Sequence, residues 1–271
     1  MKTMKQKERE ILDRWKVYSA TCEETESFAE DGLLYRGNIY FENNCWHREE
    51  GNEEHLWVKA LKRVAFLTKD LNDEEPWNIH EETGRYNHVA FQYEKAIPFY
   101  KNLRMWFYGI VNTTVEETIP YKKARNMEIT GPYYEQAPVV RINCKKQCRK
   151  GTLDNTVLST YLSRYAPYLQ EQIKLYDANI LICCGYANGI NLILNFVRSQ
   201  YLPDLISIPD TAEWIYYSPS TGKIVINAYH PSHRIGYENI YTQMIDAYQQ
   251  ALQYIQRHSL MQVEQPCKTN A

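Results

Sequence analysis

Polar side chains that could bind or hydrolyse a substrate follow the apolar segments of this sequence. A carboxylate, Asp70, follows the first segment, an amide, Asn143, ends the second, and an imidazole, His230, ends the fourth. Singly, such residues have an ordinary explanation, because Asp and Asn often cap helices and a Pro-Ser pair often begins one. Together they could line a pocket, if all three project from one edge of the same sheet.

Four apolar segments are typical of strands that are buried on both faces, as in parallel sheets. They cover residues 63–68, 138–143, 179–185 and 223–230. Between and after them, apolar residues recur at helical spacing over 99–110, 157–173, 190–197 and 240–255. Residues 213–217 add a predicted antiparallel hairpin with the fourth strand. Alternating strands and helices imply right-handed crossovers. The sequence therefore predicts an α/β fold, a three-layer α/β/α sandwich with a central, mainly parallel four-stranded sheet.

In such a sheet, ligands bind beyond the carboxyl ends of the strands, which is where Asp70, Asn143 and His230 stand. We expect residues 1–57 to form an N-terminal extension packed on the body, because the region is rich in aromatic side chains. The body covers residues 58–260, and residues 261–271 are expected to form a frayed, polar tail.

The order of the motifs resembles the uracil-DNA glycosylase superfamily. In that superfamily the first motif commonly reads Gly-Gln-Asp-Pro-Tyr-His, and the last motif begins His-Pro-Ser. Here residues 68–73 read Thr-Lys-Asp-Leu-Asn-Asp and keep only Asp70, whereas residues 230–232 match the last motif directly. Asn143 looks like the family's pyrimidine-reading asparagine. The resemblance covers roughly residues 60–258, and the missing Gly and Pro change the loop that carries Asp70.

The resemblance implies a hydrolase that cleaves the N-glycosidic bond of uracil or another damaged or modified base in DNA. As a hypothesis, Asp70 orients or deprotonates the attacking water and stabilises the positive charge of the sugar. His230 would donate a hydrogen bond to the base oxygen that becomes anionic. Asn143 would read the Watson-Crick edge of the base, since an amide both donates and accepts.

A base inside a duplex must be extruded and stacked on an aromatic ring before it reaches such a pocket. Trp77, Tyr86 and Phe91 follow the first motif and are candidates for this ring, although ordinary packing explains such aromatic residues more often.

The candidate DNA-binding residues lie after the second and fourth strands. The family places its duplex-probing residues in the loop after the last motif, where Arg234 could bind phosphate. A surface salt bridge explains Arg234 equally simply, and a solvated charged face explains the lysines. The predicted DNA-binding residues are Lys145, Lys146, Ser232, His233 and Arg234.

Composition limits the alternatives. A net charge of −2 argues against a protein whose whole surface follows phosphate, so DNA would have to contact a local strip. Seven cysteines, an odd number, favour reduced thiols, and their spacing predicts neither a zinc site nor an iron-sulfur cluster. We expect no metal and no organic cofactor. No signal peptide or membrane-spanning run is visible, which predicts a cytoplasmic protein with no membrane partner.

Two other functions stay open beside the glycosylase. One is a hydrolase of a free nucleoside or nucleotide, which a mildly acidic protein would suit. The other is a binding module that keeps the pocket without turnover and senses a modified base or a nucleotide. Dinucleotide-binding, P-loop and serine-hydrolase motifs are missing from the sequence. The oligomeric state is not predicted.

Overall fold

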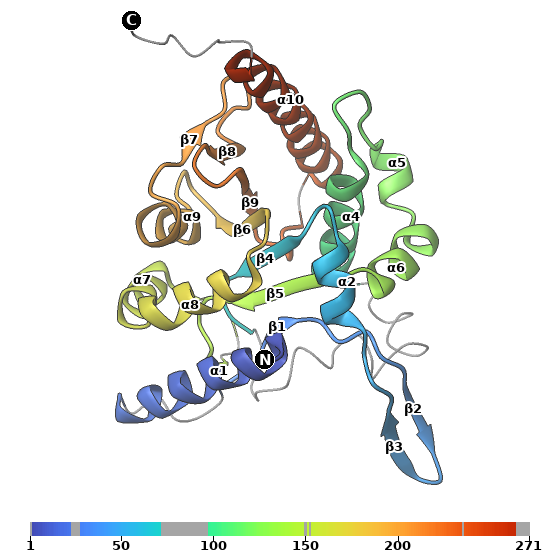
Figure 1. Cartoon of the computed structure of the whole chain (residues 1–271), viewed down its shortest axis with the longest axis vertical. Coiled ribbons are helices and arrows are strands. Elements are labelled where there is room, and N and C mark those ends of the chain that lie inside the picture. Colours follow the sequence, from blue (N-terminus) through green and yellow to red (C-terminus); the bar gives the residue numbers. More distant parts are fainter. Residues whose placement is uncertain are drawn as a thin grey trace, which may run out of the picture.

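The computed structural model describes residues 2–22, 28–71, 97–148, 151, 153–234 and 236–263 of the chain (Figure 1). The helices are α1 (Met4–Thr21), α2 (Glu53–Lys59), α4 (Pro98–Asn112), α5 (Tyr121–Ala124), α6 (Met127–Gln136), α7 (Asn155–Arg164), α8 (Ala166–Tyr176), α9 (Leu192–Phe196), which continues into a π-helical turn (Val197–Tyr201), and α10 (Tyr237–Val263). The strands are β1 (Gly32–Leu33), β2 (Ile39–Glu42), β3 (Cys45–Arg48), β4 (Val64–Thr68), β5 (Val139–Asn143), β6 (Ile180–Tyr186), β7 (Ile206–Ser207), β8 (Ile215–Ser218) and β9 (Lys223–Tyr229).

Seven of these strands form one mixed sheet, in the order β1-β5-β4-β6-β9-β8-β7. β5, β4, β6 and β9 pair in parallel, whereas β1, β8 and β7 join antiparallel at the two sides. The predicted α/β class is confirmed, and the sheet is larger than the four strands expected. β8 is the strand of the predicted hairpin. β1 and β7 have two residues each, which is too short for a periodic pattern to reveal them.

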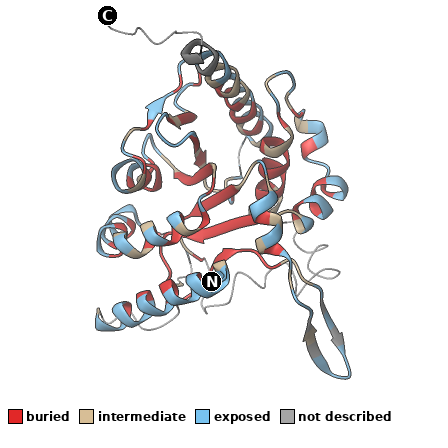
Figure 2. Cartoon of the chain, in the orientation of Figure 1, coloured by how far each residue is buried: buried red, intermediate tan, exposed pale blue. Residues whose placement is uncertain are grey.

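The central strands are buried on both faces because apolar residues occupy most positions on both of their faces. Along β4, Val64 and Phe66 belong to one core cluster, and Ala65 and Leu67 belong to the other. Helices α4, α6 and α10 contribute to the first cluster, and α1, α7, α8 and α9 contribute to the second. Figure 2 shows the buried strands between helices that are buried mainly on their inner sides.

The N-terminal region, expected as an extension, is joined to the body through the sheet. α1 begins with a capping box between Thr3 and Gln6, and its Trp15 is fully buried. β1 pairs with β5, so this region adds a strand to the sheet. The expected boundary between residues 57 and 58 falls inside α2. The β2–β3 hairpin, in contrast, extends away from the body (Figure 1).

The segments with apolar residues at helical spacing form helices, with local exceptions. The stripe over 157–173 is divided into α7 and α8, because Pro167 lacks a backbone N–H and stands in the first turn of a new helix. Val157 is 40% exposed and Ile190 is 51% exposed, so the interpretation of these two residues as core is wrong. α10 continues to Val263, past the expected start of the frayed tail, and residues 264–271 lie outside the described residues.

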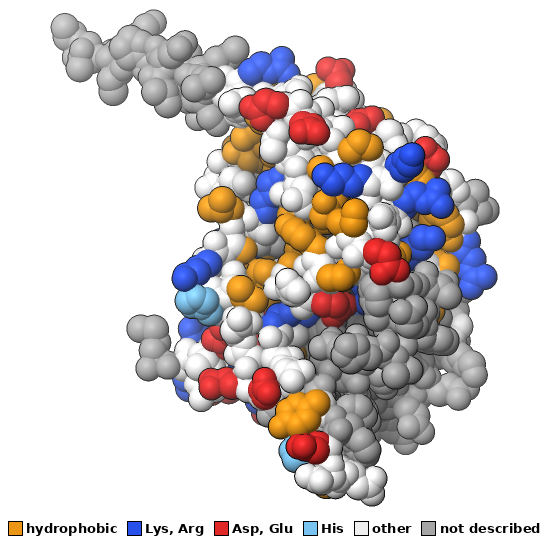
Figure 3. All heavy atoms as spheres, turned by 90° about the vertical axis from the view of Figure 1, so that its right-hand side faces the viewer, with side chains coloured by type: hydrophobic (Ala, Val, Ile, Leu, Met, Phe, Trp, Pro, Cys, Tyr) orange, Lys and Arg blue, Asp and Glu red, His pale blue; other side chains and the backbone are white. Residues whose placement is uncertain are grey.

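None of the helices in the described part of the chain is long and apolar enough to span a membrane. On the side that carries α5, α6 and α10, acidic and basic side chains are interspersed with apolar ones (Figure 3).

Candidate functional site

The parallel strands place the predicted site at their carboxyl ends, next to β4. The next described helix after β4 is α4, which packs on the first face of the sheet, whereas β5 and β6 lead to α7 and α9 on the second face. In open α/β sheets, ligands bind outside the carboxyl ends of the strands, where the connections of neighbouring strands run to opposite faces. Thr68, Arg141 and Asn143 follow the alternation of β4 and β5 toward the first face.

Asn143 is the last residue of β5, and its side chain is only 1% exposed. Thr68 donates its hydroxyl to Asn143 Oδ1 at 2.5 Å, and the backbone N–H of Asn143 donates to Asp31 Oδ2 at 2.9 Å. The amide nitrogen Nδ2 is buried without a hydrogen-bond partner among the described residues. An unpaired buried donor costs free energy, and a group that accepts a hydrogen bond from Nδ2 would recover that cost.

His230 directly follows β9, and its ring is partly buried. The backbone N–H of Ser232 donates to His230 Nδ1 at 3.2 Å, which in a neutral ring leaves the proton on Nε2. Burial, reinforced by the positive charges of Lys69 and Arg141, lowers the pKa of His230 to about 4. At neutral pH the ring is therefore uncharged and can donate through Nε2–H.

His230 lies near β5, because Phe99 on α4 is close to both the His230 ring and the Arg141 guanidinium, although β4 and β6 separate β5 from β9 in the sheet. Asn102, on α4, holds the loop after β9 by donating from Nδ2 to the carbonyl of Pro231 at 2.6 Å. The Phe99 ring, one turn earlier on α4, lies 5.8 Å from the His230 ring.

Asp70 lies two residues beyond β4 and is partly buried. The ladder between β4 and β5 continues past the strands, because the N–H groups of Cys144 and Lys145 donate to the carbonyls of Thr68 and Lys69, each at 2.8 Å. This pairing fixes the backbone up to Lys69, despite the absence of the family's Gly and Pro. The carboxylate is thus carried at the same edge as Asn143.

The two lysines after β5 are buried, against the expectation that they face DNA. Lys146 is 0% exposed and its ammonium pairs with Asp31 Oδ1 at 2.5 Å and donates to Gln172 Oε1 at 2.9 Å. Lys145 is 8% exposed and donates to the carbonyl of Gln147. The prediction for both is corrected: an ammonium held in the interior cannot reach a phosphate.

The other predicted site residues lie either in the loop after β9 or outside the described residues. Ser232 and Arg234 are exposed and His233 is partly exposed, next to His230. The predicted stacking residues, Trp77, Tyr86 and Phe91, lie outside the described residues. No group of three or more His, Cys, Asp or Glu suited to a metal ion occurs in the described part of the chain.

Arg141 is a site residue that the sequence interpretation missed. It is 3% exposed on β5, and its guanidinium lies 4.6 Å from the centre of the Phe99 ring. The signal was present, since an arginine interrupts the otherwise apolar run Val-Val-Arg-Ile. A charged side chain is rarely fully buried, and the Arg141 charge contributes to the lowered pKa of His230.

Comparisons with protein families and with curated proteins do not identify this site. No protein-family model matches the chain, and no curated protein matches it either. The chemistry that Asp70, Asn143 and His230 can perform is therefore the basis for a functional proposal.

Proposed function

We propose that this protein is a DNA glycosylase-like hydrolase that flips out uracil or another damaged or modified base and cleaves its N-glycosidic bond with water. The observation that carries the proposal is the pair of donors at the carboxyl ends of β5 and β9, the unpaired Nδ2 of Asn143 and the Nε2–H of a neutral His230. In this proposal the fold is a three-layer α/β/α sandwich, with the parallel strands β5, β4, β6 and β9 at its centre.

The two donors suit a pyrimidine-like base edge. The Nδ2 group of Asn143 donates to a carbonyl oxygen, while Oδ1, which accepts from Thr68, keeps a lone pair for a ring N–H. His230 donates to the second carbonyl oxygen. Phe99 is the described aromatic ring nearest to His230 and is available to support the flipped base.

In the proposed reaction, the bond between the sugar C1′ and the base nitrogen breaks, and its electron pair leaves with the base. Negative charge then builds up on the base oxygens, where the His230 Nε2–H and the positive charges of Lys69 and Arg141 stabilise it. Water forms the new bond to C1′ and gives a proton to the Asp70 carboxylate. The base anion afterwards takes a proton from solvent.

A second candidate is hydrolysis or binding of a free nucleoside or nucleotide at the same site. The observation that favours it is the burial of Lys145 and Lys146, which removes two of the five predicted DNA contacts. Asp70, Asn143 and His230 would keep the same roles in hydrolysis, and the substrate alone distinguishes the two activities.

The first prediction concerns Asp70→Asn. Because the neutral amide cannot take a proton from water, we expect base release from uracil-containing oligonucleotides to fall by about 10²–10⁴-fold. Oligonucleotide affinity should stay within a few-fold. Release is measured as abasic sites that alkali cleaves, in single- and double-stranded DNA that contains uracil, hypoxanthine or xanthine.

Asp246→Asn, an exposed carboxylate on α10, is the matched control and should keep wild-type rates. If the wild-type protein releases none of these bases from DNA, the glycosylase proposal fails for them. Release of base from free deoxyuridine alone would establish the nucleoside hydrolase in its place.

A further inference from the structure

His230 stands at the start of a tight turn that covers residues 230–233. The backbone N–H of His233 donates to the carbonyl of His230 at 2.9 Å, which closes the turn. Pro231 occupies the second position, where the fixed φ of proline is favoured. The backbone N–H of Ser232 then donates to His230 Nδ1 at 3.2 Å. The orientation of the imidazole therefore depends on the shape of this turn.

Asn102 of α4 holds this turn from one side. Its Nδ2 group donates to the carbonyl of Pro231 at 2.6 Å and to that of His233 at 3.4 Å. An amide nitrogen carries two hydrogens, so one side chain can serve both carbonyls. Phe99 stands three residues before Asn102 on the same face of α4, and its ring lies 5.8 Å from the His230 ring. One helix face thus contacts both the backbone of the turn and the imidazole.

An asparagine at this position of α4 costs free energy unless its amide is hydrogen-bonded. Asparagine is a poorer helix former than alanine or leucine, and burial removes the hydrogen bonds between its amide and water. Asn102 is nevertheless 2% exposed, on a helix whose buried residues are mostly apolar, among them Leu103 and Met105. The carbonyls of the turn replace the lost water as acceptors. The residue type on α4 is therefore matched to the loop that carries His230.

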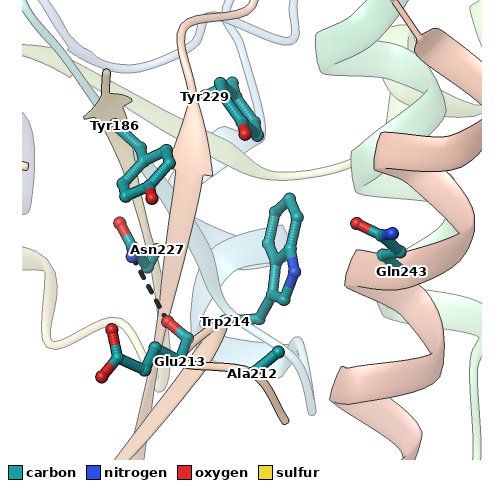
Figure 4. Close-up of a pocket in the computed structure, with 7 residues that line it drawn as sticks. All are labelled: Tyr186, Ala212, Glu213, Trp214, Asn227, Tyr229 and Gln243. Atoms are coloured by element: carbon teal, nitrogen blue, oxygen red, sulfur yellow. Dashed lines mark hydrogen bonds between the residues drawn. The ribbon is translucent and has the colours of Figure 1, made fainter. Parts of the chain in front are cut away.

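Aromatic rings support the turn from the end of β9. The His233 ring stacks on the Tyr229 ring, with centres 4.9 Å apart and an angle of 25° between the rings. Tyr229 packs in turn against Tyr186 and Trp214, with ring centres 5.1 Å and 5.9 Å away. Figure 4 shows these last three residues with Gln243, which lines the same small hollow. The turn is thus held by ring contacts at the end of β9 and by hydrogen bonds from α4.

We propose that Asn102 is a positioning residue for His230. By holding the turn, it keeps Nδ1 of the imidazole at the N–H of Ser232, so that the proton of the neutral ring stays on Nε2. Once the turn loosens, the ring reaches solvent and its proton exchanges between the two nitrogens, so Nε2 presents a lone pair to the base oxygen part of the time. The consequence for base release rests on the proposed function, whereas the geometry of the turn does not.

The protonation of His230 reports on this hold before any substrate is added. Burial, and then the positive charges of Lys69 and Arg141, lower the pKa of His230 to about 4. Lys69 follows β4 and Arg141 lies on β5, so both charges remain when Asn102 is changed. A ring that leaves its buried position regains contact with water, and its pKa then rises toward the ordinary value of 6.5.

The test compares Asn102→Leu and Asn102→Asp by NMR of the histidine ring nitrogens. Both substitutions remove the amide donor; aspartate keeps the size of asparagine, and leucine shows whether an effect depends on the new negative charge. We expect the pKa of His230 to rise by at least about one unit in both variants. At about pH 8, the Nδ1 signal should move toward that of a protonated nitrogen. The His230 signals are assigned by their absence from His230→Gln.

Asn112→Leu is the matched control, because it makes the same change at the C-terminal end of the same helix. Asn112 donates to the carbonyl of Tyr108 at 2.9 Å and lies about 15 Å from Asn102 along the helix axis. Its His230 signals should match those of the wild type. Urea unfolding of the three variants separates a changed imidazole from a general loss of stability. If Asn102→Leu does not fold, Asn102→Asp decides.

Base release by the same variants tests the consequence for the reaction. We expect both Asn102 variants to release uracil from saturating uracil-containing DNA about 10–100-fold more slowly than the wild type, because a displaced donor stabilises the base anion less. Their affinity for this DNA should stay within a few-fold, since Asn102 is buried away from the ligand.

His230 signals that are unchanged in both Asn102 variants would overturn the proposal, and so would an equal change in Asn112→Leu. Altered signals with an unchanged rate of base release would overturn the role of Asn102 in the reaction. Altered signals in a protein that releases no base even as the wild type would support the positioning of His230 and contradict the glycosylase.

Discussion

Two buried polar clusters meet at the end of β5, and they differ in how completely their atoms are paired. The support cluster consists of Glu8, Asp31, Lys146 and Gln172, and it lies beneath the strand end. In it, the Lys146 ammonium pairs with Asp31 and Gln172 and lies 4.8 Å from the Trp15 ring. At the candidate site, three residues earlier, Asn143 leaves its buried Nδ2 unpaired.

Under the proposed function, this difference separates polar groups that stabilise the fold from polar groups that bind a ligand. Asp31 takes part in both clusters, because its Oδ1 holds Lys146 and its Oδ2 accepts from the backbone of Asn143. The N-terminal region thus supports the strand end that carries the candidate site. We expect changes in the support cluster to affect stability, and changes at the site to affect ligand chemistry.

The largest effect is expected for Lys146→Met, which removes the ammonium and leaves the Asp31 carboxylate buried. We expect the free energy of unfolding to fall by about 3–5 kcal/mol, as when one partner of a buried ion pair is removed. Urea unfolding monitored by circular dichroism measures it.

The control is Arg14→Met, which breaks an exposed pair with Glu171 at 2.6 Å and should cost below about 1 kcal/mol. If Lys146→Met and Arg14→Met lower the free energy of unfolding equally, the buried ion pair contributes no more to stability than an exposed pair does.

A smaller, pH-dependent effect is expected for Glu8→Gln. Burial, and then the charge of Asp31, raise the pKa of Glu8 well above its ordinary value of 4.5. The folded state therefore binds this proton more tightly than the unfolded chain does. The stability that the carboxyl contributes is fully present below pH 4.5 and is lost as the pH rises through the raised pKa.

Glu8→Gln should accordingly be more stable than the wild type at about pH 8 and similar to it at about pH 4, in thermal unfolding at both pH values. Glu10→Gln, on the exposed side of α1, is the control; it breaks an exposed pair with Lys2 and should change stability by less than about 1 kcal/mol. If Glu8→Gln is less stable than the wild type at the higher pH, this result contradicts a raised pKa of Glu8.

The smallest change in stability is expected at the candidate site, for the pair Thr68→Val and Asn143→Leu. Thr68→Val alone removes the donor to Asn143 Oδ1 and should cost about 1–3 kcal/mol, because it leaves that buried acceptor unpaired. The double variant removes both partners and the unpaired Nδ2, so we expect stability within about 1 kcal/mol of the wild type. Base binding should be lost.

A double-mutant cycle measures this coupling. A double variant as unstable as Lys146→Met would place Asn143 in the support of the fold, and the proposed distinction between the two clusters would be wrong.

Much of the framework could be predicted, because it depends on neighbours in the chain. The largely apolar runs of β4, β5, β6 and β9 and the stripes of α4 and α10 are local patterns, and they also locate Asn143 and His230 at strand ends. β1 and β7 escaped prediction because two residues carry no period.

Which buried polar side chains are paired was decided by the tertiary structure. In the sequence, Asn143 and Lys146 are both polar residues near the end of one strand. Only the fold shows that Lys146 pairs with Asp31, which lies 115 residues earlier. The hollow lined by Tyr186, Trp214 and Gln243 joins residues from β6, β9, α10 and the loop before β8, and no local pattern connects them. The sequence by itself determined the segments and their buried faces, because burial of apolar side chains is encoded by spacing. Pairing and pocket formation depend on contacts between distant segments, and these exist only once the chain is folded.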